Sequence, residues 1–313
     1  MQSITKPPIT QSQLAKIATK HFGAFPTAIE ELTDGWFNAA FLFVYPATKY
    51  VLKVAPPEDV KVLRYEQNLM AAEVGAMVEV KAKTNLPVPA VIAYDRTGEE
   101  VDSSYFLAEC VPGVPLEKAR EGLTKEVKDS VDRQIGTCLR CLHTIDGSGF
   151  GTYNDPSHSS WYDASGFLLE NLRRDQVDAE IGLPSVTFEA ARPHLDSLKE
   201  VSTPTMIHWD LWDPNVFIDP QSGTVTGLID FERALWADPL MEGNFKRPSP
   251  SLLTGYGDPI LESPGAAARR ALYDHYLSLI MVIETTYRGF DAEHEKMSRS
   301  MLDQSITALD SLP

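Results

Sequence analysis

The chain has 313 residues, of which 43% are hydrophobic, so it is long enough for one large domain or for two lobes with separate cores. Its formal net charge of −16 argues against nucleic acid as a partner, because binding a polyanion relies on Lys and Arg side chains. Its three cysteines are too few for a disulfide framework and indicate a reducing compartment. The N-terminus has no signal-peptide core and no apolar run is long enough to span a bilayer, so we expect a cytoplasmic protein without a membrane partner.

The first part of the chain predicts a small antiparallel sheet with one main helix. Residues 10–22 have helical spacing behind a Thr cap. An amphipathic helix is expected over residues 58–81, where apolar residues recur on one face. Five short runs of β-type residues predict strands, at about 27–33, 39–45, 50–54, 90–94 and 104–110.

After residues 111–113, which read Val-Pro-Gly, the chain is expected to be mainly helical. A long helix is predicted near residues 127–142, and a β-hairpin over 215–230 is the exception to the helical pattern. Residues 245–266 are rich in Pro, Gly and Ser and predict a long loop that could cover a substrate. Further helices are expected near 158–174, 185–199, 265–288 and 291–308.

A polar loop between two apolar runs carries the clearest chemical signal. Residues 206–219 read MIHWDLWDPNVFID, and residues 227–232 read GLIDFE. Asp210 is placed to accept the proton of an acceptor hydroxyl, while Asn215 and Asp230 offer the hard oxygen ligands that suit Mg²⁺. An Asp, an Asn five residues later and a second Asp after a hairpin together form the layout that phosphoryl transfer needs.

With these motifs in this order, the chain resembles the aminoglycoside phosphotransferases and related small-molecule kinases, which share the protein-kinase fold. The resemblance runs from about Leu32 to Gly243. It implies an α+β, two-lobed protein-kinase-like fold, with a small five-stranded antiparallel sheet and one main helix in a nucleotide-binding lobe (1–111). A larger, mainly helical lobe (112–313) would hold the catalytic and acceptor-binding residues. ATP and Mg²⁺ are the implied cofactors.

Lys53 lies mid-strand among apolar residues, where a charge is costly unless it has a partner. The resemblance makes Lys53 the lysine that contacts the α- and β-phosphates. Glu66 falls on the apolar face of the helix predicted over residues 58–81 and is the expected ion-pair partner of Lys53. Glu73 lies on nearly the same face, one heptad further on, and is the alternative partner.

The resemblance also assigns the contacts around the nucleotide. Backbone N–H groups near Gly35 and Asn38, in the turn between the first two strands, are candidates for phosphate binding. The turn has only one glycine, which favours a small-molecule kinase over a protein kinase. The carbonyl of Glu109 and the N–H of Val111 would bind the edge of the purine.

Two residues are expected to support the catalytic loop. His208 would fix the shape of the loop, and Asp238 would brace it. Two positions depart from related kinases: Trp209 replaces the glycine usual between the His and the Asp, and Glu232 stands where a protein kinase would have glycine.

The expected acceptor is a hydroxyl on a small cationic molecule such as an aminoglycoside. Residues 113–313 hold 31 acidic and 18 basic side chains, a balance of −13, against 13 and 10 in residues 1–112. Such a field would attract a cation. Choline, ethanolamine and sugar or fructosamine acceptors remain alternatives, as does a nucleotide-binding pseudokinase scaffold, and the oligomeric state is left open. Candidate acceptor contacts are Asp163, Glu170, Asp274 and Glu284.

Overall fold

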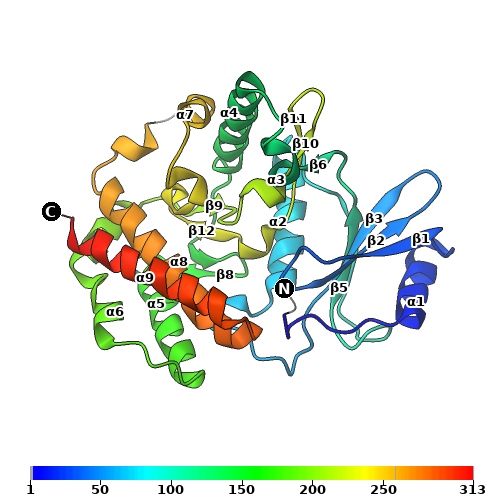
Figure 1. Ribbon diagram of the computed structural model, residues 1–313, viewed down its shortest axis with the longest axis horizontal. Helices are drawn as coiled ribbons and strands as arrows, with labels where there is room; N and C mark the ends of the chain where they lie inside the picture. The colour runs from blue at the N-terminus through cyan, green and yellow to red at the C-terminus, as the bar shows by residue number, and fades with distance from the viewer. Residues whose placement is uncertain (1–2, 258, 313) are drawn as a thin grey trace.

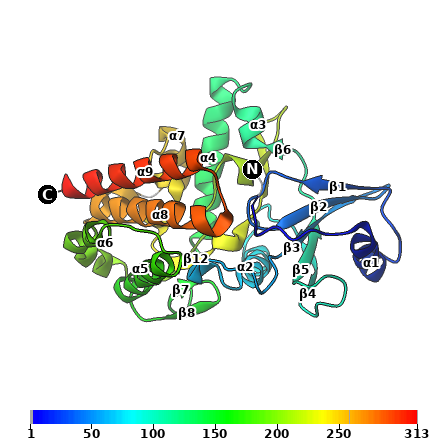
Figure 2. The same cartoon turned by 60° about the horizontal axis from the view of Figure 1, so that its bottom comes forward.

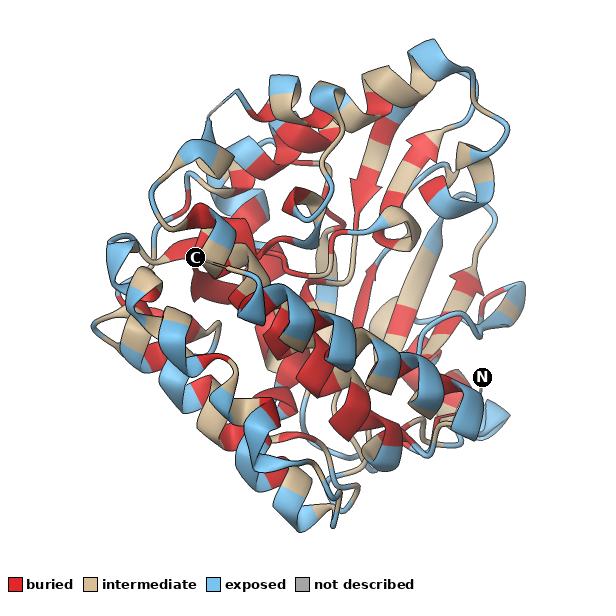
Figure 3. Ribbon diagram, turned by 60° about the vertical axis from the view of Figure 1, so that its left-hand side comes forward, coloured by how far each residue is buried: buried red, intermediate tan, exposed pale blue. Residues whose placement is uncertain are grey.

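The computed structural model describes residues 3–257 and 259–312, which form an α+β, two-lobed fold of the protein-kinase type. The smaller lobe holds the five-stranded sheet and α1, and most of the helices belong to the larger lobe (Figure 1). In Figure 3 the exposed residues line the outer faces of the peripheral helices, and the buried ones gather on the faces that point inward.

The small lobe is built on an antiparallel sheet with strand order β1-β2-β3-β5-β4. In β5 all residues but the last are buried, and alternate side chains join different clusters of apolar residues, one of them with α1 and the other with α2. The predicted sheet is confirmed. Its strands and α1 are β1 (Ala28–Leu32), β2 (Ala39–Val44), β3 (Lys49–Val54), β4 (Val91–Asp95), β5 (Tyr105–Glu109) and α1 (Gln11–Phe22).

The helix expected over residues 58–81 is shorter than predicted. Residues 58–63 are not helical, and a single 3₁₀ turn, η1 (Arg64–Glu66), precedes α2 (Leu69–Lys83). Between the two, Asn68 takes the left-handed conformation with φ of 62°. Asn tolerates this conformation better than most residues, and it separates the turn from the helix. The side chains of η1 therefore do not continue the helical face of α2.

The large lobe contains two small sheets among its helices. The short β6 (Val114–Pro115) pairs with β10 (Val216–Asp219), which pairs in turn with β11 (Thr224–Leu228). We propose the lobe boundary at residues 111 and 112, between β5 and β6. A second sheet, with order β8-β7-β12-β9, was not expected from the sequence, because its strands have only three or four residues. These strands are β7 (Phe150–Thr152), β8 (Asp155–His158), β9 (Thr205–Ile207) and β12 (Leu235–Ala237).

The helices of the large lobe follow the predicted pattern in outline. The segment expected as one helix near residues 185–199 is instead α6 followed by a 3₁₀ helix, η2 (Arg192–Glu200). In Figure 2, α8 and α9 run side by side along the lobe. Among the described residues, none of the helices combines the length and the apolar character needed to cross a membrane. The main helices are α3 (Leu116–Arg120), α4 (Lys125–Leu142), α5 (Trp161–Asp178), α6 (Ser185–Glu189), α8 (Ala266–Arg288) and α9 (Ala292–Asp310).

The long loop expected over residues 245–266 contains a docked helix, so that prediction is wrong for its central part. Ser249 caps α7 (Pro250–Tyr256), and Gly257 ends it with φ of 71°. α7 packs closely on α4, because a Cβ at Gly136 would lie 2.1 Å from the carbonyl oxygen of Leu252. The Pro and Gly residues that indicated a loop instead begin and end this helix and let its backbone approach α4.

Candidate active site

The structure brings together the three oxygen-bearing side chains that the sequence singled out. Asn215 Nδ2 donates to the backbone oxygen of Asp210 at 2.8 Å and to Asp210 Oδ2 at 3.2 Å. The backbone N–H of Ile229 donates to the carbonyl oxygen of Asn215 at 3.1 Å, so the residue before Asp230 is tied to the catalytic loop. The hairpin of β10 and β11 thus returns Asp230 to the loop that carries Asp210.

Asp210 is half-buried, and its surroundings shift its pKa. Burial raises its pKa above the usual range of an aspartate and Asp230 adds to the rise, while the positive charge of Arg233 opposes it. A carboxylate with a raised pKa is a stronger base. It accepts a proton from a hydroxyl more readily than an exposed aspartate does.

Lys53 connects both lobes through two short ion pairs. Its Nζ lies 2.6 Å from Glu73 Oε1 on α2 and 2.6 Å from Asp230 Oδ1 after β11. Burial alone would lower the pKa of Lys53, but Asp230, Glu73 and Glu232 together raise it. Lys53 therefore keeps its charge at neutral pH.

The expectation that Glu66 pairs with Lys53 is wrong, and the alternative, Glu73, is the partner. Glu66 is 2% exposed and forms a buried ion pair with Arg288 at the end of α8. Its Oε2 also accepts the N–H of Leu63 at 3.0 Å. The left-handed Asn68 explains the error, because Glu66 lies in η1 and not on the face of α2 that meets β3.

Three carboxylates gather around Lys53. Ligand oxygens of Glu73, Asp230 and Glu232 lie within 4.8 Å of one another, where two like charges repel by about 3 kcal/mol at an effective dielectric constant of about 20. Burial raises the pKa of Glu73 to about 7 against the pull of Lys53. Burial and Asp230 raise the pKa of Glu232, whereas Lys53 holds that of Asp230 below its usual range despite burial.

The oxygens in this region fit a divalent cation. Carboxylate and amide oxygens are the ligands that Mg²⁺ prefers. Glu73 Oε2 is buried and accepts no hydrogen bond from any residue that the structure describes. Asp230 supplies one of these carboxylates, whereas the Asn215 amide lies against Asp210, and metal binding by Asn215 and Asp230 stays a prediction.

The catalytic loop is held by a glutamate that the sequence analysis missed. Glu242 is fully buried, and its two carboxylate oxygens accept the N–H groups of His208 at 2.7 Å and Trp209 at 2.9 Å. Trp209 has φ of 62°, which explains why glycine is usual at this position in related kinases. A charged residue directly after the apolar pair Leu240 and Met241 was the signal that could have identified Glu242.

The two predicted supporting residues make different contacts. The ring of His208 bonds through Nε2 to the carbonyl oxygen of Ile229 at 2.9 Å and accepts the N–H of Asp210 through Nδ1 at 3.3 Å. This pattern places the ring proton on Nε2. Asp238 accepts hydrogen bonds from Arg269 at 2.8 Å and from Tyr273 at 2.7 Å on α8, and the bracing expected of Asp238 stays a prediction.

The turn between β1 and β2 lies against the large lobe. Asn38 Nδ2 donates to Glu232 Oε2 at 2.9 Å, so the side chain of Asn38 reaches the carboxylate cluster. Trp36, next to Gly35 in this turn, makes an edge-to-face contact with Phe290, with ring centroids 5.6 Å apart. The phosphate contacts proposed for the backbone of Gly35 and Asn38 stay a prediction.

The predicted hinge residues lie at the end of β5, where Glu109 is the last residue of the strand and Val111 follows it. The N–H of Glu109 donates to the carbonyl oxygen of Ala90 at 2.9 Å, and Glu109 Oε2 accepts the N–H of Ala90 at 3.2 Å. A Cβ at Gly227 would lie 2.7 Å from the Cβ of Val111, so the segment after β5 packs directly on β11. The hinge and the strand that leads to Asp230 are thus in contact, while purine binding by Glu109 and Val111 stays a prediction.

Arg233 and Glu284 lie close enough to Asp210 to act on its pKa, which Arg233 lowers and Glu284 raises. The guanidinium of Arg233 lies over the rings of Trp209 and Tyr65, 5.7 and 6.0 Å from their centroids. Glu284 lies 3.5 Å from Arg233 and 3.9 Å from Arg288. The charge of Glu284 is therefore balanced by two arginines.

The other three acids considered as acceptor contacts have local partners. Asp163 bonds to Ser160 at the start of α5, and Glu170 pairs with Arg173 and Arg174. Asp274 pairs with Arg270 and lies 3.5 Å from Lys246. The structure supports none of these three as part of the group around Asp210.

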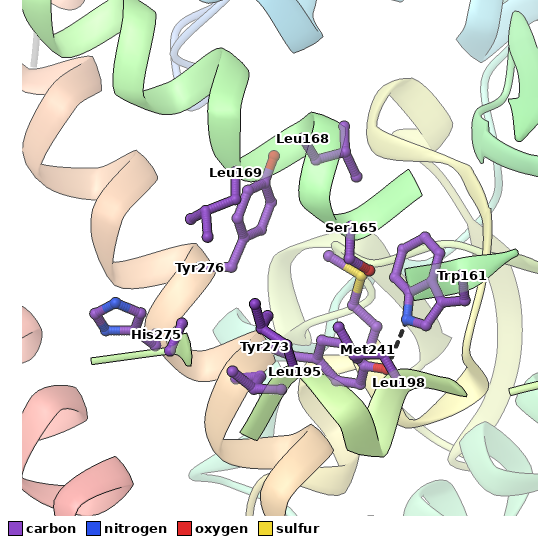
Figure 4. Close-up of a pocket in the computed structure, with 12 residues that line it drawn as sticks. Trp161, Ser165, Leu168, Leu169, Leu195, Leu198, Met241, Tyr273, His275 and Tyr276 are labelled. Carbon is purple, nitrogen blue, oxygen red and sulfur yellow. Dashed lines mark hydrogen bonds between the residues drawn. The ribbon is translucent and has the colours of Figure 1, made fainter. Parts of the chain in front are cut away.

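A small apolar cavity of about 40 Å³ lies behind the catalytic loop (Figure 4). It is lined by residues of α5, η2 and α8, and Tyr276 on its edge stacks on Trp209 with centroids 5.8 Å apart. The hydroxyl of Tyr276 is buried and bonds to no described residue. A cavity of this size holds a water molecule or two, so it is no nucleotide site.

Comparisons with known proteins agree with this geometry. Residues 28–243, more than half of the chain, match the model of the phosphotransferase enzyme family. The search of curated proteins gave no match.

Solved structures of similar fold cover nearly the whole chain. Aminoglycoside phosphotransferase APH(4)-Ia, in a ternary complex with AMP-PNP and hygromycin B, has a TM-score of 0.69 at 18% identity, covering 96% of this chain and 100% of that one. A putative fructosamine-3-kinase from Haemophilus somnus 129PT has a TM-score of 0.65 at 16% identity, with coverages of 93% and 96%.

A third structure, the GDP and kanamycin complex of APH(2")-IIIa, has a TM-score of 0.66 at 14% identity, with coverages of 95% and 98%. At these identities the likeness establishes the fold, and the family match adds the class of enzyme. This chain belongs to the phosphotransferase enzyme family.

Proposed function

We propose that the protein is a small-molecule kinase that transfers the γ-phosphoryl group of ATP, with Mg²⁺, to a hydroxyl group. The observation that carries the proposal is Lys53 held between Glu73 and Asp230, with the bonded pair of Asp210 and Asn215 beside them. A phosphate-binding lysine, metal ligands and a base at one junction of two lobes are the parts that phosphoryl transfer requires.

Each residue has a defined task in this proposal. Asp210 orients the acceptor hydroxyl and accepts its proton, and the raised pKa favours that transfer. Lys53 binds the α- and β-phosphates. Mg²⁺, which Asn215 and Asp230 would hold, would supply positive charge that offsets the charge of the triphosphate.

The remaining contacts position the nucleotide. The backbone of Gly35 and Asn38 would bind phosphate oxygens, and Glu109 and Val111 would bind the purine edge. A neighbouring fold was solved with AMP-PNP and another with GDP, so GTP is the alternative donor to test against ATP.

A cationic hydroxyl compound of the aminoglycoside type is the first candidate acceptor. The net charge of −16 supports it, because an acidic surface concentrates a cation. Two of the fold neighbours were solved with hygromycin B and with kanamycin. Choline and ethanolamine share the required positive charge.

A sugar or fructosamine acceptor is the second candidate, and the charges beside Asp210 favour it. Among the residues that the structure describes, Glu284 near the proposed base is balanced by Arg233 and Arg288, so it offers no free charge to a cationic acceptor. A pseudokinase scaffold is the remaining alternative, and Lys53 and Asp210 both argue against it.

The test is turnover of ATP and of GTP by the purified protein against aminoglycosides, amino alcohols, sugars and fructosamines. We expect transfer to at least one hydroxyl compound and loss of transfer in Asp210→Ala. The surface variant Asp303→Ala is the matched control and should keep wild-type rates. Tight nucleotide binding without transfer to any compound of the panel would support the scaffold instead.

A further inference from the structure

The helix α2, which carries Glu73, is held by the turn of the β7–β8 hairpin in the large lobe. Tyr153 and Asn154 are the two residues of this turn. A Cβ at Gly75 of α2 would lie 2.6 Å from Tyr153 Cε1, so the ring of Tyr153 lies directly on the backbone of the helix. A residue with a side chain at position 75 would have to push the helix and the ring apart.

Two hydrogen bonds add to this contact. The hydroxyl of Tyr153 donates to Glu79 Oε2 at 2.8 Å, and Glu79 Oε1 lies 2.7 Å from Lys83, one turn further along α2. Asn154 Nδ2 donates at 3.0 Å to the carbonyl oxygen of Asn68, the left-handed residue directly before α2. The hairpin turn therefore holds both the start and the middle of α2.

Tyr153 is in turn fixed by the rest of the large lobe. Its ring stacks on that of Trp236 in β12, with centroids 5.7 Å apart and planes inclined by 21°. Its N–H donates to the carbonyl oxygen of Ala234 at 3.2 Å, and its carbonyl oxygen accepts a hydrogen bond from Trp236 Nε1 at 3.2 Å. A ring held on its face and through its backbone presents a fixed surface to α2.

The turn η1 before α2 is tied to the same lobe. Arg64 pairs with Asp175 and Asp178 at the end of α5, with its Nη2 2.6 Å from Asp178 Oδ2. The N–H of Arg64 donates to Asp175 Oδ2 at 3.1 Å, and the pair of Glu66 with Arg288 adds a second tie. The large lobe thus holds η1 and α2 together.

The residues of α2 that meet the hairpin turn lie opposite to Glu73. Gly75 and Glu79 are four positions apart and share one face, while Glu73 lies on about the other side of the helix, because a turn has about 3.6 residues. Lys53 lies 2.6 Å from Glu73 on one side of α2, and Tyr153 contacts the helix from the other. A shift of α2 at Tyr153 would therefore move the Glu73 carboxylate relative to Lys53.

We propose that Tyr153 is a positioning residue for the ion pair of Lys53 and Glu73. The hairpin turn sets the rotation and the height of α2, and thereby the place at which the Glu73 carboxylate meets the ammonium group of Lys53. The inference rests on the proposed function, in which Lys53 binds the α- and β-phosphates. It assigns part of the nucleotide site to a residue of the large lobe that does not touch the nucleotide.

The experiment is a double-mutant cycle of Tyr153→Leu and Glu73→Gln, two residues on opposite sides of α2. Calorimetric titration measures the affinity of the full chain for the magnesium complex of AMP-PNP in wild type, in both single variants and in the double variant. We expect Tyr153→Leu to weaken binding about fivefold or more in the wild-type background but by less than about twofold when position 73 is Gln. Without the Glu73 charge, the exact position of α2 no longer serves Lys53.

Two results would overturn the role of Tyr153. One is a loss of equal size in both backgrounds, because a residue that only stabilises the fold acts independently of Glu73. The other is affinity within about twofold of wild type in Tyr153→Leu, even where thermal unfolding shows a less stable protein. Tyr162→Leu, at a half-buried tyrosine of α5, is the matched control and should bind the nucleotide as wild type does. If Tyr153→Leu does not fold, Gly75→Ala replaces it in the cycle, since the added methyl group displaces α2 from the ring.

The same measurements separate this inference from the proposed function. A wild-type protein that binds the magnesium nucleotide and transfers its phosphoryl group, but shows independent effects in the cycle, overturns only the role of Tyr153. Coupled effects in a protein that transfers to no acceptor support Tyr153 and overturn the proposed transfer. Absence of nucleotide binding by the wild-type protein overturns both.

Discussion

Burial of Asp210 has a consequence for the pH dependence of catalysis. A base must be deprotonated to work, and burial raises the pKa of Asp210. Activity is therefore present above that raised pKa and is lost as the pH falls through it. We expect the acidic limb of kcat to lie above the usual range of an aspartate. A kcat profile that stays flat down to about pH 4, near the pKa of an unperturbed aspartate, would contradict this assignment.

The two glutamates near Lys53 give a sharp comparison. Glu73→Gln removes the charge that holds Lys53, so affinity for the magnesium nucleotide should fall about tenfold or more. Glu66→Gln leaves Lys53 untouched but removes the shorter of the two described ion pairs of Arg288, which should cost about 3 kcal/mol of unfolding free energy. Calorimetric titration and urea unfolding measure the two effects. If Glu66→Gln instead weakened nucleotide binding and Glu73→Gln lowered only the stability, Glu66 would be the partner of Lys53.

Two tyrosines of α8 differ in whether their hydroxyl groups form hydrogen bonds. Tyr273 donates to Asp238 at 2.7 Å and accepts from Trp161 at 2.8 Å, so Tyr273→Phe should cost about 1–3 kcal/mol. The buried hydroxyl of Tyr276 has no described partner, so Tyr276→Phe should be neutral or slightly stabilising. Thermal or urea unfolding compares them, and an equal loss in both variants would show that the Tyr276 hydroxyl is bonded after all.

At the scale of single residues, the sequence identified those residues whose role depends on spacing along the chain. Asp210, Asn215 and Asp230 meet because a loop and a hairpin bring them together locally. The partner of Lys53 depends on the phase of a helix, and the left-handed Asn68 changed that phase. The role of Glu242 depends on packing between segments more than 30 residues apart, which no local pattern records.

At the scale of elements, most strands of the small lobe were predictable because they are apolar runs bounded by turns, although β1 reads AIEEL and is mostly exposed. The strands β7, β8, β9 and β12 were not, since three or four residues are too few to show a period. α7 was missed for a different reason. Its Pro and Gly residues have positional roles in a helix that docks on α4, and composition alone assigns them to a loop.

The contact of α4 with α7 can be tested through its glycines. Gly136→Ala would place a methyl group 2.1 Å from a backbone oxygen that cannot move freely, so we expect a loss of about 1–3 kcal/mol or more in unfolding free energy. The control is Gly166→Ala on the exposed face of α5, where a Cβ meets nothing within 4 Å. That change should stabilise by about 0.5–1 kcal/mol. Equal effects in the two variants would contradict close packing of α7.

At the scale of the whole molecule, the two lobes are joined at several points around one site. Lys53 reaches Asp230, Asn38 reaches Glu232, and Glu66 pairs with Arg288. These links connect β3, the turn before β2 and η1 with the large lobe. The two-lobed architecture was predictable from the order of motifs, but these links were not, since each joins residues more than 170 positions apart.

The central claim is that the junction of the lobes transfers a phosphoryl group from a bound nucleotide with Asp210 as the base. Single-turnover transfer of the γ-phosphoryl group to an acceptor found in the compound panel tests it most directly, in wild type and Asp210→Asn. We predict that Asp210→Asn binds the magnesium nucleotide within about twofold of wild type but transfers the group at least about a hundredfold more slowly. Equal transfer rates in the two proteins would contradict the assignment of Asp210 as the base.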